Sequence, residues 1–389
     1  MAIQLSVIGA VFAALLAAAI VSFIATPVVR SLAFKIGAVD VPKDARRMHN
    51  HPIPRMGGLA IFFGFILSAL IFIPLDAPLR GMLLGSVMIV ILGIFDDIYA
   101  LPAKPKFVIQ IVAASVAVVM GNKIEILSNP NLFSSNPYWD LGILSIPISV
   151  LWIVGITNAV NLIDGLDGLA CGVSTISSMT MLVIALSVAE PDVALLMAAL
   201  AGACIGFLPY NLNPAKIFMG DTGSTFLGFI LATVSINGLF KSYAIISFAV
   251  PFLMLGLPIF DTCFAIFRRV SKGQSPMSPD RGHIHHRLID MGFSQKQAVA
   301  VLYVISAILG LSAVMLTTTN VLKAILFFLT VCVAGGLAAK LYLAHNDQTH
   351  QEPDPPTARE GAKPRKLNNP PTDVAGNHYF FGEEERSDK

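Results

Sequence analysis

Charged residues are scarce in this sequence, and their scarcity excludes an ordinary soluble domain. Asp, Glu, Lys and Arg account for 13% of the 389 residues, whereas soluble domains contain about 25%. Hydrophobic residues account for 55%, and the mean hydropathy is +0.73. This composition predicts an all-α polytopic membrane protein that is long enough for many spans.

Cysteine motifs and an excess of basic charge are also missing. The four cysteines lie in apolar runs without a C-x-x-C pair, so we interpret them as small buried hydrophobic residues rather than disulfide partners or metal ligands. The net charge of +2 gives no indication of nucleic-acid binding. No basic segment precedes the first apolar run, Leu5–Val29, which is too long for the core of a cleaved signal peptide. We expect it to be a retained first span.

The sequence does contain a series of long apolar runs. A spanning helix needs about 20 apolar residues, and we expect about eleven transmembrane helices within an integral membrane domain of residues 1–344. The runs are Leu5–Val29, Gly57–Ile73, Gly81–Phe95, Phe107–Met120, Leu144–Ile156, Leu169–Val188, Val193–Leu208, Thr225–Leu239, Tyr243–Phe267, Ala298–Leu316 and Val321–Leu343. Residues 345–389 are polar and rich in proline, which predicts a disordered cytoplasmic tail.

The distribution of Lys and Arg predicts how these helices are oriented. Basic residues concentrate in the cytoplasmic loops of membrane proteins. If the loop after the first span is cytoplasmic, 22 of the 26 basic residues lie on that side, which places the N-terminus outside and the C-terminus in the cytoplasm. Every polar cluster described below then falls on the cytoplasmic side. We therefore expect a cytoplasmic-face active site, whereas a transporter would place its polar groups near the midplane.

One polar stretch lies between two apolar runs and organises the rest of the chain. It reads N-A-V-N-L-I-D-G-L-D-G from Asn158 to Gly168. Helical residues three apart are separated by about 60°, so Asn158 and Asn161 share a face, as do Asn161 and Asp164. The two glycines predict a tight turn that folds Asp167 back. Closely spaced oxygen ligands suit Mg²⁺ or Mn²⁺, and helix-end capping by Asn and Asp is the alternative.

Two more acidic clusters lie at the ends of predicted spans. Asp96 and Asp97 end the third span, and adjacent helical residues point about 100° apart, so one can face a metal and the other a reacting group. Lys106 is a candidate phosphate contact, and a snorkelling lysine beside a charge pair is the alternative. Asp221, in F-M-G-D-T-G-S, is a candidate metal ligand at a helix N-terminus, with a simple cap as the alternative.

A histidine-rich segment lies in the longest internal cytoplasmic loop. It contains Arg281, His283, His285, His286 and Arg287. Such a cluster can bind zinc, transfer protons or bind phosphate. Zinc is less favoured because no cysteine is nearby and the acidic clusters indicate a hard cation. A solvated basic loop is the remaining alternative.

Two single residues have open roles. Arg55 precedes Gly57-Gly58 and is either an anchor that orients the helices or an anion contact. Asp261 lies about two turns inside the end of the ninth predicted span. An intramembrane acid is a functional candidate, and pairing with Arg268 or another basic residue is the alternative.

Taken in order, these motifs carry a family resemblance. The series DD-x₈-K, N-A-V-N-L-I-D-G-L-D-G-L, F-M-G-D-T-G-S and H-I-H-H-R-L resembles the polyprenyl-phosphate N-acetylhexosamine-1-phosphate transferases of the glycosyltransferase 4 family. The resemblance runs from about Asp40 to Leu288 and is strongest to the WecA/TagO branch. The related MraY branch shares the acidic motifs, but its histidine motif reads differently.

The resemblance implies a reaction and a set of site residues. UDP-GlcNAc and undecaprenyl phosphate would give undecaprenyl-diphospho-GlcNAc and UMP, with Mg²⁺ (or Mn²⁺), as the first step of a cell-envelope polysaccharide. By motif position, the metal ligands would be Asp221 and Asn161, and the catalytic group would be Asp96, Asp97, Asp164 and Asp167. The substrate-binding group would be Lys106, Asn158, Arg281, His283, His285, His286 and Arg287. The expected partners are both substrates and the bilayer of the inner or plasma membrane, and a homodimer is left open.

The resemblance leaves the Asp96–Asp97 pair open between a base and a metal-binding or positioning role. A phosphate with a second pKa of about 6 is already mostly dianionic at pH 7, so a base gains little. We favour the second role, with direct attack of the lipid phosphate on the β-phosphorus. The alternative activity is an MraY-type transfer of phospho-MurNAc-pentapeptide. A secondary transporter or a non-catalytic scaffold is the alternative from another class.

Overall fold

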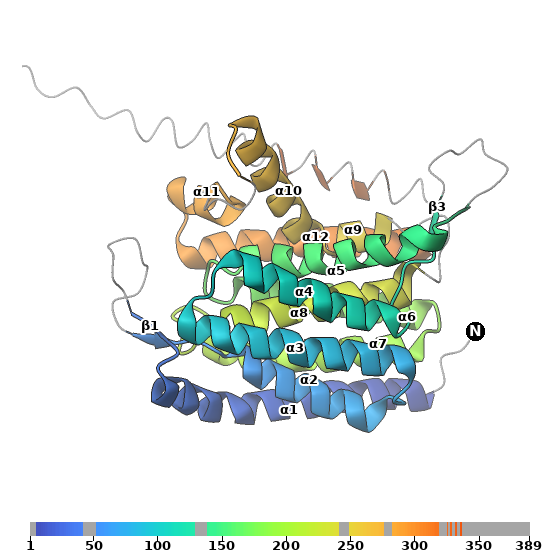
Figure 1. Ribbon diagram of the computed structural model, residues 1–389, viewed down its shortest axis with the longest axis horizontal. Coiled ribbons are helices and arrows are strands. Elements are labelled where there is room, and N and C mark those ends of the chain that lie inside the picture. The colour runs from blue at the N-terminus through green and yellow to red at the C-terminus, as the bar shows by residue number, and fades with distance from the viewer. Residues whose placement is uncertain are drawn as a thin grey trace, which may run out of the picture. The chain divides into compact units, whose positions relative to one another are not determined.

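Helices dominate the structure (Figure 1). The computed structural model describes residues 5–41, 52–128, 138–240, 249–275 and 282–318, together with a few residues between 325 and 336. The helices are α1 (Leu5–Ile36), α2 (Gly58–Phe72), α3 (Ala77–Tyr99), α4 (Ala103–Val119), α5 (Ser145–Leu162), α6 (Leu169–Ser187), α7 (Pro191–Asn211), α8 (Gly220–Ser235), α9 (Ala249–Met254), α10 (Gly256–Ser271), α11 (Ile284–Asp290) and α12 (Gln295–Thr318). A 3₁₀ turn precedes α5 at Gly142–Leu144, and a π-helical turn follows α8 at Ile236–Phe240.

Among the described residues, six helices are long and apolar enough to cross a membrane. They are α1, α3, α5 with its preceding turn, α6, α7 and α12, and α2 is a shorter apolar helix. The prediction of a helical polytopic membrane protein is confirmed. Each of the first eight predicted runs coincides with one of the helices α1 to α8, and the tenth coincides with α12. Most of the last run and the predicted tail of residues 345–389 lie outside the described residues. The count of eleven stays a prediction, and so does the orientation.

The ninth predicted span is not one helix, and the expectation of a continuous segment was wrong. Its described part forms α9 and α10, which are separated at Leu255. Pro258 is the cause, because proline lacks an N–H and its ring clashes with the carbonyl four residues earlier. That carbonyl belongs to Met254, and it accepts a 2.9 Å hydrogen bond from Ser177 Oγ on α6 instead. A side chain from a neighbouring helix thus satisfies the backbone group that the break releases.

Two short antiparallel hairpins supplement the all-α architecture that we predicted. Strand β1 (Val39–Asp40) pairs with β2 (Ile53–Pro54), with Val39 opposite Pro54. Strand β3 (Ile126–Ser128) pairs with β4 (Tyr138–Asp140), with Leu127 opposite Trp139. The labels of β1 and β3 mark opposite ends of the helices (Figure 1). Two- and three-residue strands are too short to show a period of two in the sequence.

Helix α8 forms the centre of the packing, with α2, α3, α5 and α6 around it (Figure 1). Every residue from Thr222 to Ser235 is buried. At its N-terminal end, α8 crosses α2 so closely that a β-carbon at Gly58 would overlap the backbone of Gly223. The segment before α8 is also tied to β2 and α2, because Phe218 N–H donates to the Pro54 carbonyl and Gly58 N–H to the Met219 carbonyl, each at 2.9 Å. The start of α8 is therefore held firmly in place.

Helices α1 and α7 approach each other through small residues. A β-carbon added at Gly202 or Gly206 of α7 would overlap the carbonyl oxygens of Leu15 or Ala19 of α1. Between helices in lipid, such close packing replaces the hydrophobic driving force that operates in water.

We expect Gly206→Ala to lower the free energy of unfolding by about 1–3 kcal/mol, the usual cost of overpacking. Gly155→Ala on α5 is the matched control, because no described atom lies within 4 Å of a β-carbon built there. Higher helix propensity should leave that control neutral or slightly stabilised. Thermal unfolding in detergent compares the two variants, and equal shifts would contradict the close α1–α7 contact.

Candidate active site

A polar cavity of about 440 Å³ lies beside the N-terminus of α8. Five of its lining residues are aspartates, namely Asp40, Asp97, Asp164, Asp167 and Asp221. The other lining residues with polar or aromatic side chains are Arg55, Asn161, Asn211, Phe218, His286 and Gln295. Segments that are far apart in the sequence converge here, as the sequence predicted for Asp97, Asn161, Asp164, Asp167, Asp221 and His286.

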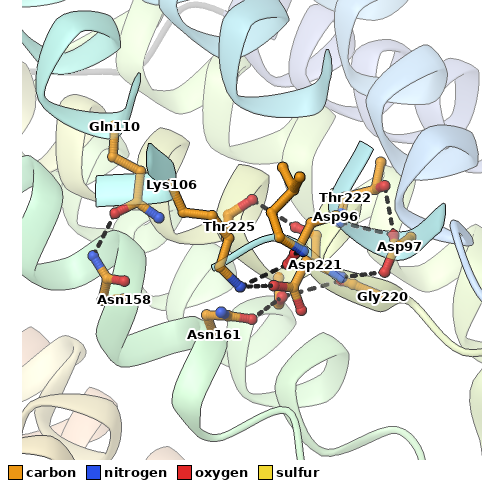
Figure 2. Close-up of polar contacts among 12 residues, drawn as sticks. Asp96, Asp97, Lys106, Gln110, Asn158, Asn161, Gly220, Asp221, Thr222 and Thr225 are labelled. Carbon is orange, nitrogen blue, oxygen red and sulfur yellow. Dashed lines mark hydrogen bonds and ion pairs between the residues drawn. The ribbon is translucent and has the colours of Figure 1, made fainter. Parts of the chain in front are cut away.

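Asp97 binds the N-terminus of α8 (Figure 2). Its carboxylate accepts hydrogen bonds from Asp221 N–H at 2.9 Å, Thr222 N–H at 3.1 Å and Thr222 Oγ1 at 2.6 Å. Gly220 has φ +72°, and a β-carbon there would overlap the Asp97 carboxylate. Asp97 thus satisfies amides that a helix start leaves unpaired, and its negative charge is favourable at that position. The three donors hold the Asp97 carboxylate, which in return fixes the backbone of Asp221.

Asp96 points to different partners from its neighbour, as adjacent residues of a helix should. Its Oδ2 lies 2.7 Å from Lys106 Nζ, and its Oδ1 accepts from Leu101 N–H at 2.7 Å. Lys106 Nζ also lies 3.3 Å from Asp221 Oδ2 (Figure 2). Lys106 therefore bridges two of the predicted acids. Neither Asp96 nor Lys106 lines the cavity.

The two asparagines of α5 have different surroundings. Asn161 lines the cavity, and its Oδ1 accepts a 2.6 Å hydrogen bond from Ser224 Oγ. Asn158 Nδ2 donates to Gln110 Oε1 on α4 at 2.7 Å (Figure 2). It also donates to the Val154 carbonyl at 2.8 Å. Asn158 thus connects α5 to α4 and is not among the lining residues.

The glycines after α5 form the turn that the sequence predicted. Helix α5 ends at Leu162, α6 begins at Leu169, and Gly168 has φ +78°. We call residues 163–168 the acidic loop. Within it, Asp167 Oδ2 accepts from Asn213 Nδ2 at 2.9 Å and Ala215 N–H at 3.0 Å.

Helix α12 holds the same loop from another side. Tyr303 Oη donates to the Gly168 carbonyl at 2.6 Å, and Asn213 Nδ2 also lies 2.7 Å from Gln295 Oε1. The acidic loop is therefore fixed between α12 and the segment before α8.

The three histidines separate into buried and cavity-lining residues. His286 lines the cavity, whereas His283 and His285 are buried and do not. Burial, and then the nearby His286, lowers the pKa of His285 to about 4. Arg287 is exposed on α11, and Arg281 lies outside the described residues.

Several lining residues were not among the predicted site residues. Asp40 and Arg55 lie on or beside the β1–β2 hairpin, with Arg55 Nη2 3.4 Å from Asp40 Oδ1. The sequence left two roles for Arg55, either an anchor that orients the helices or an anion contact. Its place in the wall of the cavity favours the anion contact. Phe218 belongs to the F-M-G-D-T-G-S motif, which we interpreted only for its acid, Asp221. Asn211 and Gln295 occur at helix ends, where polar residues alone give no signal.

The chain is similar to known proteins over most of its length. The profile of glycosyl transferase family 4 matches residues 79–239. A probable undecaprenyl-phosphate N-acetylglucosaminyl 1-phosphate transferase from Bacillus subtilis is 46% identical over 299 residues, which cover 77% of this chain and 82% of the relative. The chain belongs to glycosyl transferase family 4.

Two further relatives show the breadth of the family. A decaprenyl-phosphate N-acetylglucosaminephosphotransferase from Mycolicibacterium smegmatis is 38% identical over 329 residues, covering 77% of this chain and 80% of that protein. A phospho-N-acetylmuramoyl-pentapeptide-transferase from Staphylococcus aureus is 33% identical over 276 residues, covering 66% and 83%. The chain is thus a membrane transferase, and the predicted family resemblance is confirmed.

The donor atoms of this family 4 site fit a hard divalent cation. Asp221 and Asn161 offer carboxylate and carboxamide oxygens to the same cavity. No three His, Cys, Asp or Glu side chains within the described ranges form a closed metal site. Mg²⁺ does not need one, because it usually takes one or two carboxylates and completes its shell with water and substrate phosphate.

Negative charge accumulates in the cavity and acts on Asp164. Removal from water, and then the charges of Asp221 and Asp97, raise the pKa of Asp164 to about 8, while Arg55 acts in the opposite direction. A bound cation would oppose this shift. When only the protein side chains are counted, the cavity therefore has more negative than positive charge.

The raised pKa of Asp164 predicts a pH-dependent stability. The unfolded carboxyl has a pKa of about 4, so ionisation of Asp164 opposes folding, and stability should fall as the pH rises from about 4 to about 8. In metal-free detergent solution, the Tm of Asp164→Asn relative to wild type should therefore increase between pH 5 and pH 8. Added Mg²⁺ should reduce the difference at pH 8. A difference that is constant with pH would contradict the assignment.

Proposed function

We propose that this transferase moves N-acetylglucosamine 1-phosphate from UDP-GlcNAc to undecaprenyl phosphate. The products are undecaprenyl-diphospho-GlcNAc and UMP, and the step initiates a cell-envelope polysaccharide. The observation that carries the proposal is the acidic cavity at the ends of α3, α5 and α8, together with 46% identity to a relative named for this transfer. The lipid phosphate of the acceptor can reach such a site from the bilayer surface.

The proposal includes a cytoplasmic site in the inner or plasma membrane, with eleven spans and an external N-terminus. Support comes from the predicted cytoplasmic loops, which meet beside the site. Arg30 Nε donates to the Lys216 carbonyl at 3.1 Å, and Lys106 bridges Asp96 and Asp221. A cluster of basic residues at one end of the helices is the arrangement that the positive-inside rule expects.

The residues suggest how charge is managed during transfer. An oxygen of the lipid phosphate attacks the β-phosphorus, and the bond to the bridging oxygen breaks, so that UMP leaves with its electron pair. Bringing two anions together is the main barrier. Arg55 in the cavity wall and Lys106 behind Asp221 supply fixed positive charge. Asp221 and Asn161 would hold Mg²⁺, which when bound supplies further neutralisation of phosphate charge.

The bonding of the two α3 acids supports positioning over proton abstraction. Asp97 is engaged by three donors of α8, and Asp96 by Lys106 and the Leu101 amide. The attacking phosphate is mostly dianionic at pH 7 because its second pKa is about 6. A base is therefore not required for the attack.

Release of UMP from UDP-GlcNAc tests the function. Purified protein in detergent should release UMP only when undecaprenyl phosphate and Mg²⁺ are both present, and a GlcNAc-diphospholipid should form in equal amount. UMP release without the lipid would defeat the proposal. Preference for the UDP-MurNAc-pentapeptide donor in a parallel reaction would assign the chain to the alternative activity.

We expect Asp221→Asn to lower kcat by on the order of 100-fold, the scale of losing one group that stabilises transition-state charge. An amide is a poorer ligand for a hard cation, so higher Mg²⁺ should restore part of the activity. The matched control is Asp76→Asn at the first residue before α3, where the side chain accepts from Leu79 N–H and Asn caps equally well. Wild-type turnover of Asp221→Asn at limiting Mg²⁺ would contradict its ligand role.

A further inference from the structure

A buried carboxylate outside the cavity binds the start of the histidine segment. Asp261 of α10 is 2% exposed. Its Oδ2 lies 2.8 Å from His283 Nδ1, and its Oδ1 accepts from Ile284 N–H at 2.9 Å. His283 is the residue before α11, and Ile284 is the first residue of that helix. One side chain of α10 therefore fixes both the position and the direction of α11.

This geometry also determines the tautomer of His283. A carboxylate only accepts hydrogen bonds, so Nδ1 carries the hydrogen in the bond to Asp261. In the neutral ring, Nε2 is then the acceptor. Arg268, also on α10, supports the approach to α11 because its Nη1 donates to the Gly282 carbonyl at 2.9 Å. Two α10 side chains thus hold consecutive residues of the segment.

The contact continues from His283 to the acidic loop. The rings of His283 and His285 are nearly parallel, with 8° between their planes and 5.7 Å between their centroids. His285 is 3% exposed, and a β-carbon added at Gly165 would overlap its imidazole. The His285 ring therefore lies directly against the backbone between Asp164 and Asp167.

His286 is the member of the segment that reaches the cavity. Its ring centroid lies 4.2 Å from that of His285, and it lines the cavity with the acids of the loop. The position of His286 relative to Asp164 and Asp167 is thus set by a stack that begins at Asp261. Asp261 does not line the cavity, so it cannot act by touching the substrate there.

We propose that Asp261 is a positioning residue, which acts through His283 and His285 to hold His286 in register with the acidic loop. The consequence for catalysis rests on the proposed function, because it assumes that the cavity binds the sugar nucleotide. The structural claim does not depend on that function. It requires only that a change at Asp261 alters His283 and the His285–Gly165 contact.

Asp261→Asn tests the structural claim directly. The Asn side chain keeps an oxygen for Ile284 N–H but presents an NH₂ group to His283 Nδ1, which moves the ring hydrogen to Nε2. In ¹⁵N-histidine-labelled protein, the His283 Nδ1 signal, assigned by its loss in His283→Ala, should change from the protonated to the unprotonated type. An unchanged signal in folded Asp261→Asn would overturn the proposal whether or not the enzyme transfers GlcNAc 1-phosphate.

A double-mutant cycle tests the functional consequence. Asp261→Asn and Gly165→Ala should each lower kcat/KM for UDP-GlcNAc by about 10–100-fold, as changes to supporting groups of a site commonly do. Because both displace His285, the double variant should lie within about three-fold of the worse single variant. The KM for the lipid should change little. If the two losses of kcat/KM instead multiply in the double variant, Asp261 and the His285–Gly165 contact are not coupled, and the proposal is overturned.

Ser224→Ala provides the control cycle. This substitution removes the hydrogen bond from Ser224 Oγ to Asn161 Oδ1, and neither residue is a hydrogen-bond partner of Asp261. The activity losses of Ser224→Ala and Asp261→Asn should therefore multiply in the double variant. A conservative rescue is available if Asp261→Asn does not fold. His283→Asn keeps a donor near the position of Nδ1, whereas His283→Ala does not, so His283→Asn should retain more activity at equal Tm. Equal loss in these two variants would also overturn the proposal.

Discussion

The bond between Asp97 and the start of α8 is the constraint on which the rest of the site depends. Helix α8 is buried from Thr222 to Ser235, so the amides at its start need hydrogen-bond partners from the protein. Asp97 satisfies those of Asp221 and Thr222 with one carboxylate from α3. The same contact fixes the backbone of Asp221, whose side chain reaches Lys106 and, through it, Asp96. Three helices are thus joined through a few charge-assisted hydrogen bonds, which are stronger than neutral ones.

Most of the negative charges at the site have individual hydrogen-bond or ion-pair partners. Asp97 has the amides of α8, Asp167 has Asn213 and the Ala215 amide, and Asp96 has Lys106. Asp164 lies among these acids, and removal from water, together with the charges of Asp221 and Asp97, raises its pKa to about 8. A diphosphate substrate would add further negative charge. We therefore propose that a cation accompanies the substrate, and the oxygen donors of Asp221 and Asn161 suit such a cation.

Much of this could be predicted from the sequence, because the informative residues are polar groups in an apolar chain. The positions of Asp97, Asn161, Asp164, Asp167 and Asp221 around one cavity followed from their places at helix ends and from the glycine turn. Their partners did not follow. The packing of α4 against α5 decides whether the Asn158 side chain contacts Gln110 or lines the cavity, and no local sequence pattern specifies that packing. Pro258 is a local indication of the interruption between α9 and α10. The long apolar run Tyr243–Phe267 was nevertheless interpreted as one span.

The histidine segment shows why a motif does not assign roles to its members. Three histidines within four residues are chemically alike in the sequence, yet α11 has only seven residues, and its direction decides which ring faces the cavity. That direction is imposed by Asp261, which is buried and must be paired. Its partner is a loop residue rather than a basic residue of its own helix, so the orientation of α10 is transmitted to His286. Because α10 is separated from α9 at Leu255, the interruption between these helices and the placement of His286 are parts of one structural arrangement.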